Sequence, residues 1–428
     1  MTGNQLLAAA VEVDITPPVG TLFAGYHARK GTSLGVHDPL LTQLLLLQSG
    51  DDHIVLITMD LLGVGLGFAR RVRAGIEEAI GVPGCATMIA CSHTHSGPAG
   101  FLPPLADVRP PEDSQLQSIA ARKLIGAALW ARECLQPAFL GVGRGEVEDI
   151  GRNRNDPVNG LLDTEVTVVR VDDARRQPLA VVMNYGCHPT VMGYQNFLLS
   201  ADYPGAARAA LRRIYPHTIF MYTNGASGDV STRFTRREQT FGEVDRMGRI
   251  LAGEVLKAMQ PILTQDVVPL KAHVVPVELK FRSFPAAQEA RHKVEEHQAA
   301  LDELRAAGAS HGDLRRAITR LEGATGQVAL ARQLGGGTHT SSEVQVLKIG
   351  DLALVGLPGE PFTQTVLEIK ERSASEHTAV ISYANDDQGY FPDPVSVEEE
   401  TYEALISPYG ADVADMLRDV ALQFLSRG

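Results

Sequence analysis

The chain has 428 residues, of which 44% are hydrophobic and 21% are charged, and its formal net charge is −12. This composition is typical of a globular protein with a sizeable core, and the acidic balance without a long basic run argues against nucleic acid as a partner. No apolar run approaches the length of a membrane span, so we expect no stable insertion into a membrane.

The start of the chain and its cysteines bear on the compartment. No basic segment precedes the short apolar patch within residues 1–11, so we expect no secretory signal peptide. The four cysteines show no paired spacing, and we therefore expect a reduced, cytoplasmic protein. Cys187 stands beside His188 and could bind a metal, although a free cysteine is more often a small buried thiol.

The first part of the chain alternates strands with helices. Residues 11–16 alternate in polarity as a strand does, and the apolar runs 40–47 and 53–59 on either side of a turn predict a hairpin. Apolar residues at helical spacing predict a helix over 68–80, with Gly81 at its C-cap. The next expected elements are a strand at 86–90, a helix at 115–135, strands at 165–171 and 179–185, a helix at 202–214 and a strand at 218–223.

Between residues 285 and 334 the composition shifts to Ala, Glu, Arg and Leu with helical periodicity, interrupted by a glycine-containing break at 308–312. We expect a helical hairpin whose polar face is solvated rather than part of a site. Strands resume at 342–349 and 352–357. The predicted fold class is α/β, with mixed β-sheets flanked by helices and a helical hairpin inserted near 286–334, in a single domain over residues 1–428.

The most informative motif is His93-Thr-His95, which directly follows the apolar run 86–90. In a strand, residues i and i+2 point to the same face, so we expect both imidazoles to enter one site at the end of the strand. Such a pair can present two nitrogens to a metal, or one to a metal and one to a substrate. The alternative is that two polar residues simply close the strand.

Four more polar clusters also follow predicted strands. They contain His188 before a proline, Asp229 and Ser231 in a glycine-containing loop, Glu360 after a Pro-Gly turn, and Tyr390 in a polar loop. Each has a structural alternative. His188 could be a hydrogen-bonded structural histidine, the loop with Asp229 and Ser231 a plain turn, and Tyr390 a packing aromatic. Glu360 could be a helix N-cap, a position that glutamate fills poorly. Because α/β sheets build sites at the carboxyl ends of their strands, we expect the clusters to converge.

These motifs together resemble the catalytic domain of the neutral/alkaline non-lysosomal ceramidases, zinc-dependent amidases that cleave the N-acyl bond of ceramide. The segment Ser-His-Thr-His-Ser-Gly-Pro at 92–98 resembles the most diagnostic motif of that family. The other similar segments, in the same order along the chain, are 13–17, 25–26, 35–37, Asn153-Arg154, 228–231, 357–360 and the pair Tyr390 and Tyr402.

The resemblance implies a zinc centre and a catalytic group. The implied zinc ligands are His93, His188, Glu360 and Tyr390, and the implied catalytic residues are His95, Arg154, Ser231 and Tyr402. His95 and Arg154 would bind or polarise the substrate carbonyl. Zinc lowers the pKa of a bound water to about 7, so hydroxide attack on the amide carbon is one route. Ser231 as an acyl-accepting nucleophile is the other.

Three departures from the family pattern bear on the substrate. Thr232-Arg233 stands where the family has Pro-Asn after the serine, and we expect neither a secretion signal nor the family's C-terminal β-sandwich domain. These features favour a more soluble N-acyl amide than ceramide. We therefore predict a zinc-dependent amidohydrolase acting on a small-molecule amide, as a possible homo-oligomer. The alternatives are a zinc-free esterase using Ser231, His95 and Asp229, and an inactive module that binds an acylated ligand.

Overall fold

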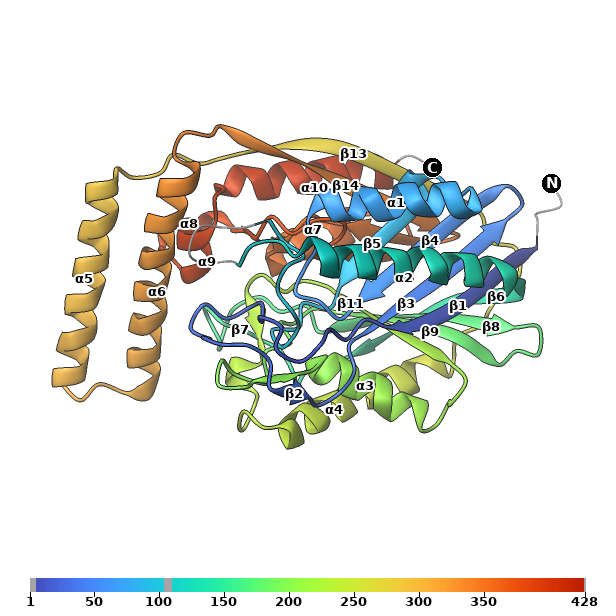
Figure 1. The fold of residues 1–428 in the computed structure, drawn as a ribbon, viewed down its shortest axis with the longest axis horizontal. Coiled ribbons are helices and arrows are strands. Elements are labelled where there is room, and N and C mark those ends of the chain that lie inside the picture. Colours follow the sequence, from blue (N-terminus) through green and yellow to red (C-terminus); the bar gives the residue numbers. More distant parts are fainter. Residues whose placement is uncertain (1–4, 104–109, 427–428) are drawn as a thin grey trace.

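The computed structural model describes residues 5–103 and 110–426, and its ribbon is shown in Figure 1. Residues 1–4, which begin the segment 1–11 in which we expect no signal peptide, lie outside the described part. Among the described helices, none has the length and apolar character needed to cross a membrane. The architecture is a mixed α/β fold of two large sheets with helices outside them, as the sequence predicts.

The larger sheet has eight strands. Their order across the sheet is β11 (Ile219–Asn224), β9 (Pro178–Tyr185), β8 (Glu165–Asp173), β6 (Gln136–Glu146), β1 (Leu6–Asp14), β3 (Leu41–Ser49), β4 (Asp52–Met59) and β5 (Thr87–Cys91). The pairs at both edges, β9–β11 and β4–β5, are parallel, whereas the inner pairs are antiparallel. β3 and β4 confirm the predicted hairpin, with Gly50 at φ 62° in its turn.

The second sheet has four strands, and it packs face to face with the first. Its order is β13 (Leu270–Lys280), β14 (His339–Ile349), β15 (Leu352–Gly356) and β17 (His377–Ile381), the last two being parallel. One hydrophobic cluster joins Leu45 and Leu56 of the larger sheet to Leu354 of the second. The neighbouring residues Leu44 and Ile57 point to the opposite face, against helices. Because the hairpin strands are buried on both faces, they read as continuous apolar runs.

Helices cover the outer face of each sheet, which gives four layers (Figure 1). On the larger sheet lie α1 (Leu66–Ile80), α2 (Ser114–Glu133), α3 (Asp202–Arg212) and α4 (Phe241–Met259), and on the second lie α7 (Thr363–Arg372) and α10 (Ala411–Leu425). α1 ends as predicted, because Gly81 adopts φ 73° and its N–H bonds to Glu77.

The predicted helical hairpin is confirmed as α5 (Ala287–Ala306) and α6 (His311–Leu334), which project from the body of the molecule (Figure 1). The second helix runs to Leu334, where the predicted insertion ends. Two glycines within it, Gly323 and Gly326, face Leu405 and Ile406 of α9 (Tyr402–Ile406), so the small residues allow close helix packing. The hairpin thereby supports the short helix α9.

Short elements connect the layers near one end of both sheets. Three two-stranded ladders pair β2 (Gly35–Val36) with β10 (Leu198–Leu199), β7 (Arg152–Asn153) with β12 (Val230–Ser231), and β16 (Glu360–Pro361) with β18 (Tyr390–Phe391). The remaining elements are the 3₁₀ turns η1 (Gly84–Ala86) and η2 (Thr232–Phe234) and the helix α8 (Pro394–Glu398). Two of these ladders carry residues that the sequence assigns to the site.

Candidate active site

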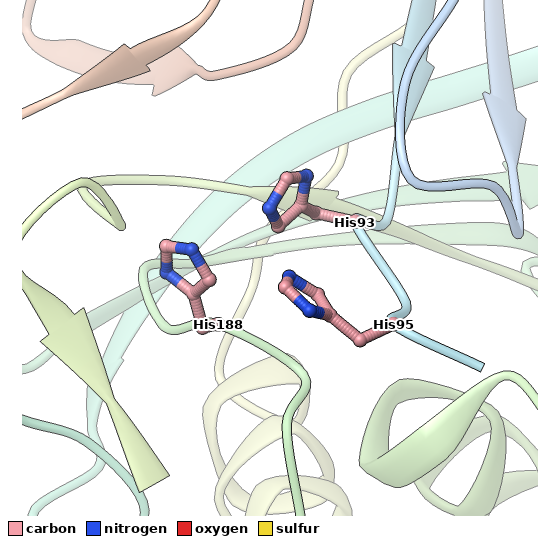
Figure 2. A group of neighbouring side chains, drawn as sticks. All are labelled: His93, His95 and His188. Atoms are coloured by element: carbon pink, nitrogen blue, oxygen red, sulfur yellow. The ribbon is translucent and has the colours of Figure 1, made fainter. Parts of the chain in front are cut away.

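Three buried histidines converge beyond the ends of β5 and β9. His93, His95 and His188 each offer a ring nitrogen, and these nitrogens all lie within 4.8 Å of one another. Figure 2 shows the three rings turned toward a common space from two separate segments. The convergence of strand-end clusters that the sequence predicts is therefore seen for these residues.

His93 and His95 meet for a different reason from the one predicted. The expectation that both project from the same strand face is wrong, because β5 ends at Cys91 and His93 has φ 67°. The chain turns there because the N–H of Ser92 donates to the carbonyl of Met59, the last residue of β4, and the N–H of His93 donates to that of Leu61, just beyond the strand. The turn leaves the two imidazoles edge to face, with ring centres 4.9 Å apart.

Main-chain carbonyls fix the orientation of two of the histidines. Nδ1 of His93 lies 2.7 Å from the carbonyl oxygen of Leu62, and Nδ1 of His188 lies 2.6 Å from that of Ser227. A carbonyl oxygen can only accept a hydrogen bond, so Nδ1 must be the donor and carry the hydrogen, and Nε2 keeps its lone pair. This arrangement, in which one ring nitrogen is anchored and the other is free, is typical of histidines that bind metals.

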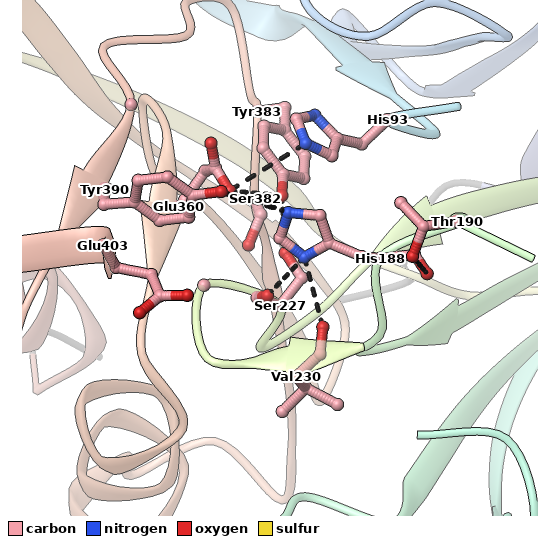
Figure 3. Close-up of polar contacts among 12 residues, drawn as sticks. His93, His188, Thr190, Ser227, Val230, Glu360, Ser382, Tyr383, Tyr390 and Glu403 are labelled. Carbon is pink, nitrogen blue, oxygen red and sulfur yellow. Dashed lines mark hydrogen bonds and ion pairs between the residues drawn. The ribbon is translucent and has the colours of Figure 1, made fainter. Parts of the chain in front are cut away.

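Glu360 and Tyr390 complete a compact group with these histidines (Figure 3). They are direct partners in the β16–β18 ladder, which places both side chains beside His188. Oε2 of Glu360 lies 3.1 Å from Nε2 of His188 and 3.9 Å from Nε2 of His93, and the Tyr390 hydroxyl lies 3.5 Å from Nε2 of His188. Zinc bonds of about 2.0 Å at tetrahedral angles separate ligand atoms by about 3.3 Å. The spacing therefore fits a metal.

Glu360 is free of the helix-capping role that was its alternative. The N-cap position of α7 is Phe362, which makes no side-chain cap bond. Instead, the Asp229 carboxylate accepts hydrogen bonds from the N–H and hydroxyl of Thr363 at 2.9 and 2.8 Å. The Glu360 side chain is thus left to face the histidines.

Burial sets the protonation of the group. Burial lowers the pKa of both His93 and His188 to about 3, so these imidazoles are neutral at physiological pH. Burial also raises the pKa of the Glu360 carboxyl, although the positive charge of Arg154 acts in the opposite direction, and burial raises the pKa of the Tyr390 phenol well above its ordinary value. Neutral imidazoles keep a nitrogen lone pair available for a metal ion, and such an ion would also stabilise the charge of the buried Glu360 carboxylate.

Arg154 and Tyr402 lie beside this group. Nε of Arg154 forms an ion pair with Glu403 at 2.6 Å, Nη2 donates to the Gly228 carbonyl at 2.6 Å, and the guanidinium carbon is 5.3 Å from the centre of the Tyr390 ring. Burial works against the charged guanidinium, but the pairing with Glu403 outweighs it and raises the pKa of Arg154. The rings of Tyr390 and Tyr402 have centres 6.4 Å apart. Both predicted catalytic residues therefore border the predicted ligands.

Ser231 lies close to the histidines, but no serine triad is assembled. Its backbone forms a parallel bridge with His188. Within the described residues, neither ring nitrogen of His95 has a hydrogen-bond partner. The Asp229 carboxylate is occupied by Thr363 and by the Asn153 amide at 2.9 Å. The Ser–His–Asp contacts of the zinc-free alternative are therefore not formed.

Three neighbours of the site were not identified from the sequence. Tyr383 stacks on His93 with ring centres 3.8 Å apart, Glu403 pairs with Arg154, and Arg29 donates to the His95 carbonyl at 2.7 Å. The signal for Tyr383 was its polar loop after a strand, and for Glu403 its position next to Tyr402. Cys187 is buried, and burial raises its thiol pKa, which favours a packed thiol over a metal ligand.

Sequence comparison matches residues 7–231 to the family described as neutral/alkaline non-lysosomal ceramidase, N-terminal. The chain is 24% identical to Neutral ceramidase 2 of Arabidopsis thaliana over 238 residues, which cover 51% of this chain and 30% of the relative. It is 29% identical to Neutral ceramidase A of Dictyostelium discoideum over 139 residues, which cover 28% of this chain and 19% of the relative. The matched parts thus span less than a third of these relatives.

Two solved structures share the fold. The neutral ceramidase from Pseudomonas aeruginosa superposes with a TM-score of 0.77 at 19% identity, covering 99% of this chain and 75% of that one. A ceramidase complexed with C2 superposes with a TM-score of 0.75 at 17% identity, covering 98% and 74%. The predicted fold class and the family resemblance are therefore confirmed.

Proposed function

Because the chain belongs to the neutral/alkaline non-lysosomal ceramidase family, we propose that it is a zinc-dependent amidohydrolase that cleaves a linear N-acyl amide. The observation that carries the proposal is the buried approach of Glu360 to His188 at 3.1 Å, with the Nε2 atom of His93 at 3.9 Å from the same oxygen. Two imidazoles and one carboxylate form a ligand set typical of hydrolytic zinc.

In this proposal His93, His188, Glu360 and Tyr390 hold the zinc. When bound, the metal supplies a Lewis acid and lowers the pKa of water to about 7. Arg154 favours the phenolate form of Tyr390, because its charge opposes the rise in the phenol pKa that burial causes. The charge of Arg154 is itself held in place by Glu403.

The remaining site residues would act on the substrate. His95 has two ring nitrogens without hydrogen-bond partners in the described part of the chain, so it is available to bind the amide carbonyl. Arg154 and Tyr402 would stabilise negative charge that develops on the carbonyl oxygen. Hydrolysis adds the oxygen of water to the carbonyl carbon, breaks the C–N bond and leaves a proton on the amine. Ser231, beside His188, is kept as the alternative nucleophile.

The test is zinc quantification in the purified protein together with hydrolysis of N-acyl amides. We expect one tightly bound zinc per chain, and loss of both zinc and activity in His93→Ala and His188→Ala. His217→Ala serves as the matched control, because this histidine is exposed. A metal-free wild type with full activity would overturn the proposal.

The preference for a more soluble amide than ceramide stays a prediction. Comparing hydrolysis rates on short and long N-acyl chains, the latter in micelles, tests it. Faster hydrolysis of short acyl chains supports the prediction, and a strong preference for long-chain ceramide contradicts it.

A further inference from the structure

Tyr383 is a buried aromatic residue in a costly backbone conformation. It follows β17, has φ 56° and is fully buried. A bulky side chain in the left-handed region is an outlier, and such energetically unfavourable conformations gather at functional sites. Its N–H donates to the Gly359 carbonyl at 3.0 Å, in the turn that leads directly into Glu360. The surrounding fold therefore holds Tyr383 in place next to a predicted ligand.

The side chain of Tyr383 contacts two of the predicted ligands (Figure 3). Its hydroxyl donates to Oε2 of Glu360 at 3.3 Å, and its ring stacks on His93 with centres 3.8 Å apart and planes 8° apart. Oε2 is the same oxygen that approaches both histidines. A rotation of the carboxylate would therefore break the contact with Tyr383 as well.

Ser227 connects this contact to a third ligand. Its hydroxyl lies 2.8 Å from the Tyr383 hydroxyl, and its carbonyl oxygen lies 2.6 Å from Nδ1 of His188. A phenol has one proton to donate, and Tyr383 gives it to Glu360, so Ser227 must donate to Tyr383. The pair of Tyr383 and Ser227 thus touches His93, His188 and Glu360.

We propose that Tyr383 is a positioning residue, which with Ser227 fixes the directions of His93, His188 and Glu360 before a metal binds. This inference rests on the proposed zinc site. Outer partners of metal ligands restrict the rotation of those ligands, and their loss weakens metal affinity by about 10–100-fold. Tyr383 would act only through the ligands, not on the substrate.

Tyr383→Phe tests the proposal, because it keeps the ring and its stacking but removes the hydroxyl. The matched control is Tyr222→Phe, which removes an equally buried hydroxyl that bonds to Tyr203 and to the carbonyl of Tyr185. For each protein we would measure the zinc dissociation constant by competition with a chelator, and the unfolding temperature of the metal-free form. We expect Tyr383→Phe to weaken zinc binding about 10–100-fold relative to wild type, and Tyr222→Phe to leave it unchanged.

Ser227→Ala is the second variant, and it carries the test if Tyr383→Phe does not fold. It keeps the carbonyl that orients His188 and removes only the hydroxyl that holds Tyr383. We expect weaker zinc binding here too. Wild-type affinity in either folded variant, or equal weakening in Tyr222→Phe, would overturn the positioning role while leaving the zinc enzyme intact. A wild type that binds no zinc would overturn both.

Discussion

At the scale of single residues, His95 is the histidine whose role the geometry separates from the others. His93 and His188 each anchor Nδ1 on a carbonyl, whereas His95 has no hydrogen-bond partner on either ring nitrogen within the described residues. The Oε2 atom of Glu360 lies 3.1 Å from Nε2 of His188 and 3.9 Å from Nε2 of His93, the two nitrogens that the carbonyl contacts leave free. We therefore favour Glu360 over His95 as the third ligand.

His95→Ala should retain zinc and lose turnover. Removing one group that stabilises charge on a substrate carbonyl lowers kcat by about 100-fold or more. His93→Ala, in contrast, should lose zinc and activity together. Zinc stoichiometry and kcat measured on both variants separate the two roles. If His95→Ala loses zinc as His93→Ala does, then His95 is a ligand.

Tyr390 offers a second test at a single atom. Tyr390→Phe keeps the ring beside Arg154 but removes the oxygen 3.5 Å from His188. If that oxygen binds the metal, zinc affinity should fall by at least about 10-fold, with a large loss of turnover. Tyr402→Phe is the comparison, since its ring neighbours that of Tyr390, with centres 6.4 Å apart, but Tyr402 is not a predicted ligand and its variant should keep zinc. Equal zinc affinity in Tyr390→Phe and wild type would remove Tyr390 from the ligand set.

Protonation of His95 should couple stability to pH in the metal-free protein. Burial lowers the pKa of His95 well below the ordinary value of about 6.5. Below about pH 6.5 the unfolded chain binds a proton that the folded chain resists, so stability falls as the pH drops. His95→Gln cannot take up that proton. The free energy of unfolding of wild type, minus that of this variant, should therefore decrease as the pH is lowered from about 6.5 toward the depressed pKa of His95 in the folded protein. Denaturant unfolding at several pH values measures the difference, and a constant difference would contradict it.

At the scale of elements, the inserted hairpin supports the site through α9. Gly323 of α6 leaves room for Leu405, and a Cβ there would stand 2.9 Å from its Cδ1. α9 carries Tyr402 and Glu403, and Glu403 holds Arg154. The hairpin carries none of the four predicted ligands, yet it bears on the position of Arg154.

Gly323→Val should displace α9 and misplace Arg154. A shift of about 1 Å can reduce turnover by up to about 100-fold, while zinc content should stay at one per chain. Gly253→Val in α4 is the matched control, because nothing lies within 4 Å of a Cβ at that position. Normal kinetics in Gly323→Val, or equal losses in both variants, would show that the hairpin does not support the site.

The elements that the sequence predicts well are those specified by local patterns. The β3–β4 hairpin follows from two apolar runs and a turn, and α1 follows from helical spacing and Gly81. The end of β5 was predicted to within one residue, but the turn at His93 was not, because it is formed by backbone hydrogen bonds to Met59 and Leu61, far earlier in the chain. Tyr383 and Glu403 were missed for the same reason, since their partners lie far away in sequence and only packing brings them together.

At the scale of the whole molecule, the four-layer packing could not be predicted from periodicity. Taken alone, the continuous apolar runs of β3 and β4 are equally consistent with a buried helix segment or with a strand covered on both faces. The family resemblance predicted which residues would bind zinc, but it did not predict how the two sheets bring those residues together. The matched family segment, 7–231, contains His93 and His188, whereas Glu360 and Tyr390 lie after it.

The division of the predicted ligands between the two parts of the chain has a consequence for the order of events during refolding. The histidines follow strands of the larger sheet, and Glu360 and Tyr390 follow strands of the second, so neither sheet alone holds the whole group. Contacts between residues so distant in sequence form late, because closing long loops is entropically unfavourable. We expect zinc capture to coincide with the slowest folding phase. Stopped-flow refolding with a zinc-sensitive dye would follow it, and capture in an early phase would mean that the histidines alone suffice.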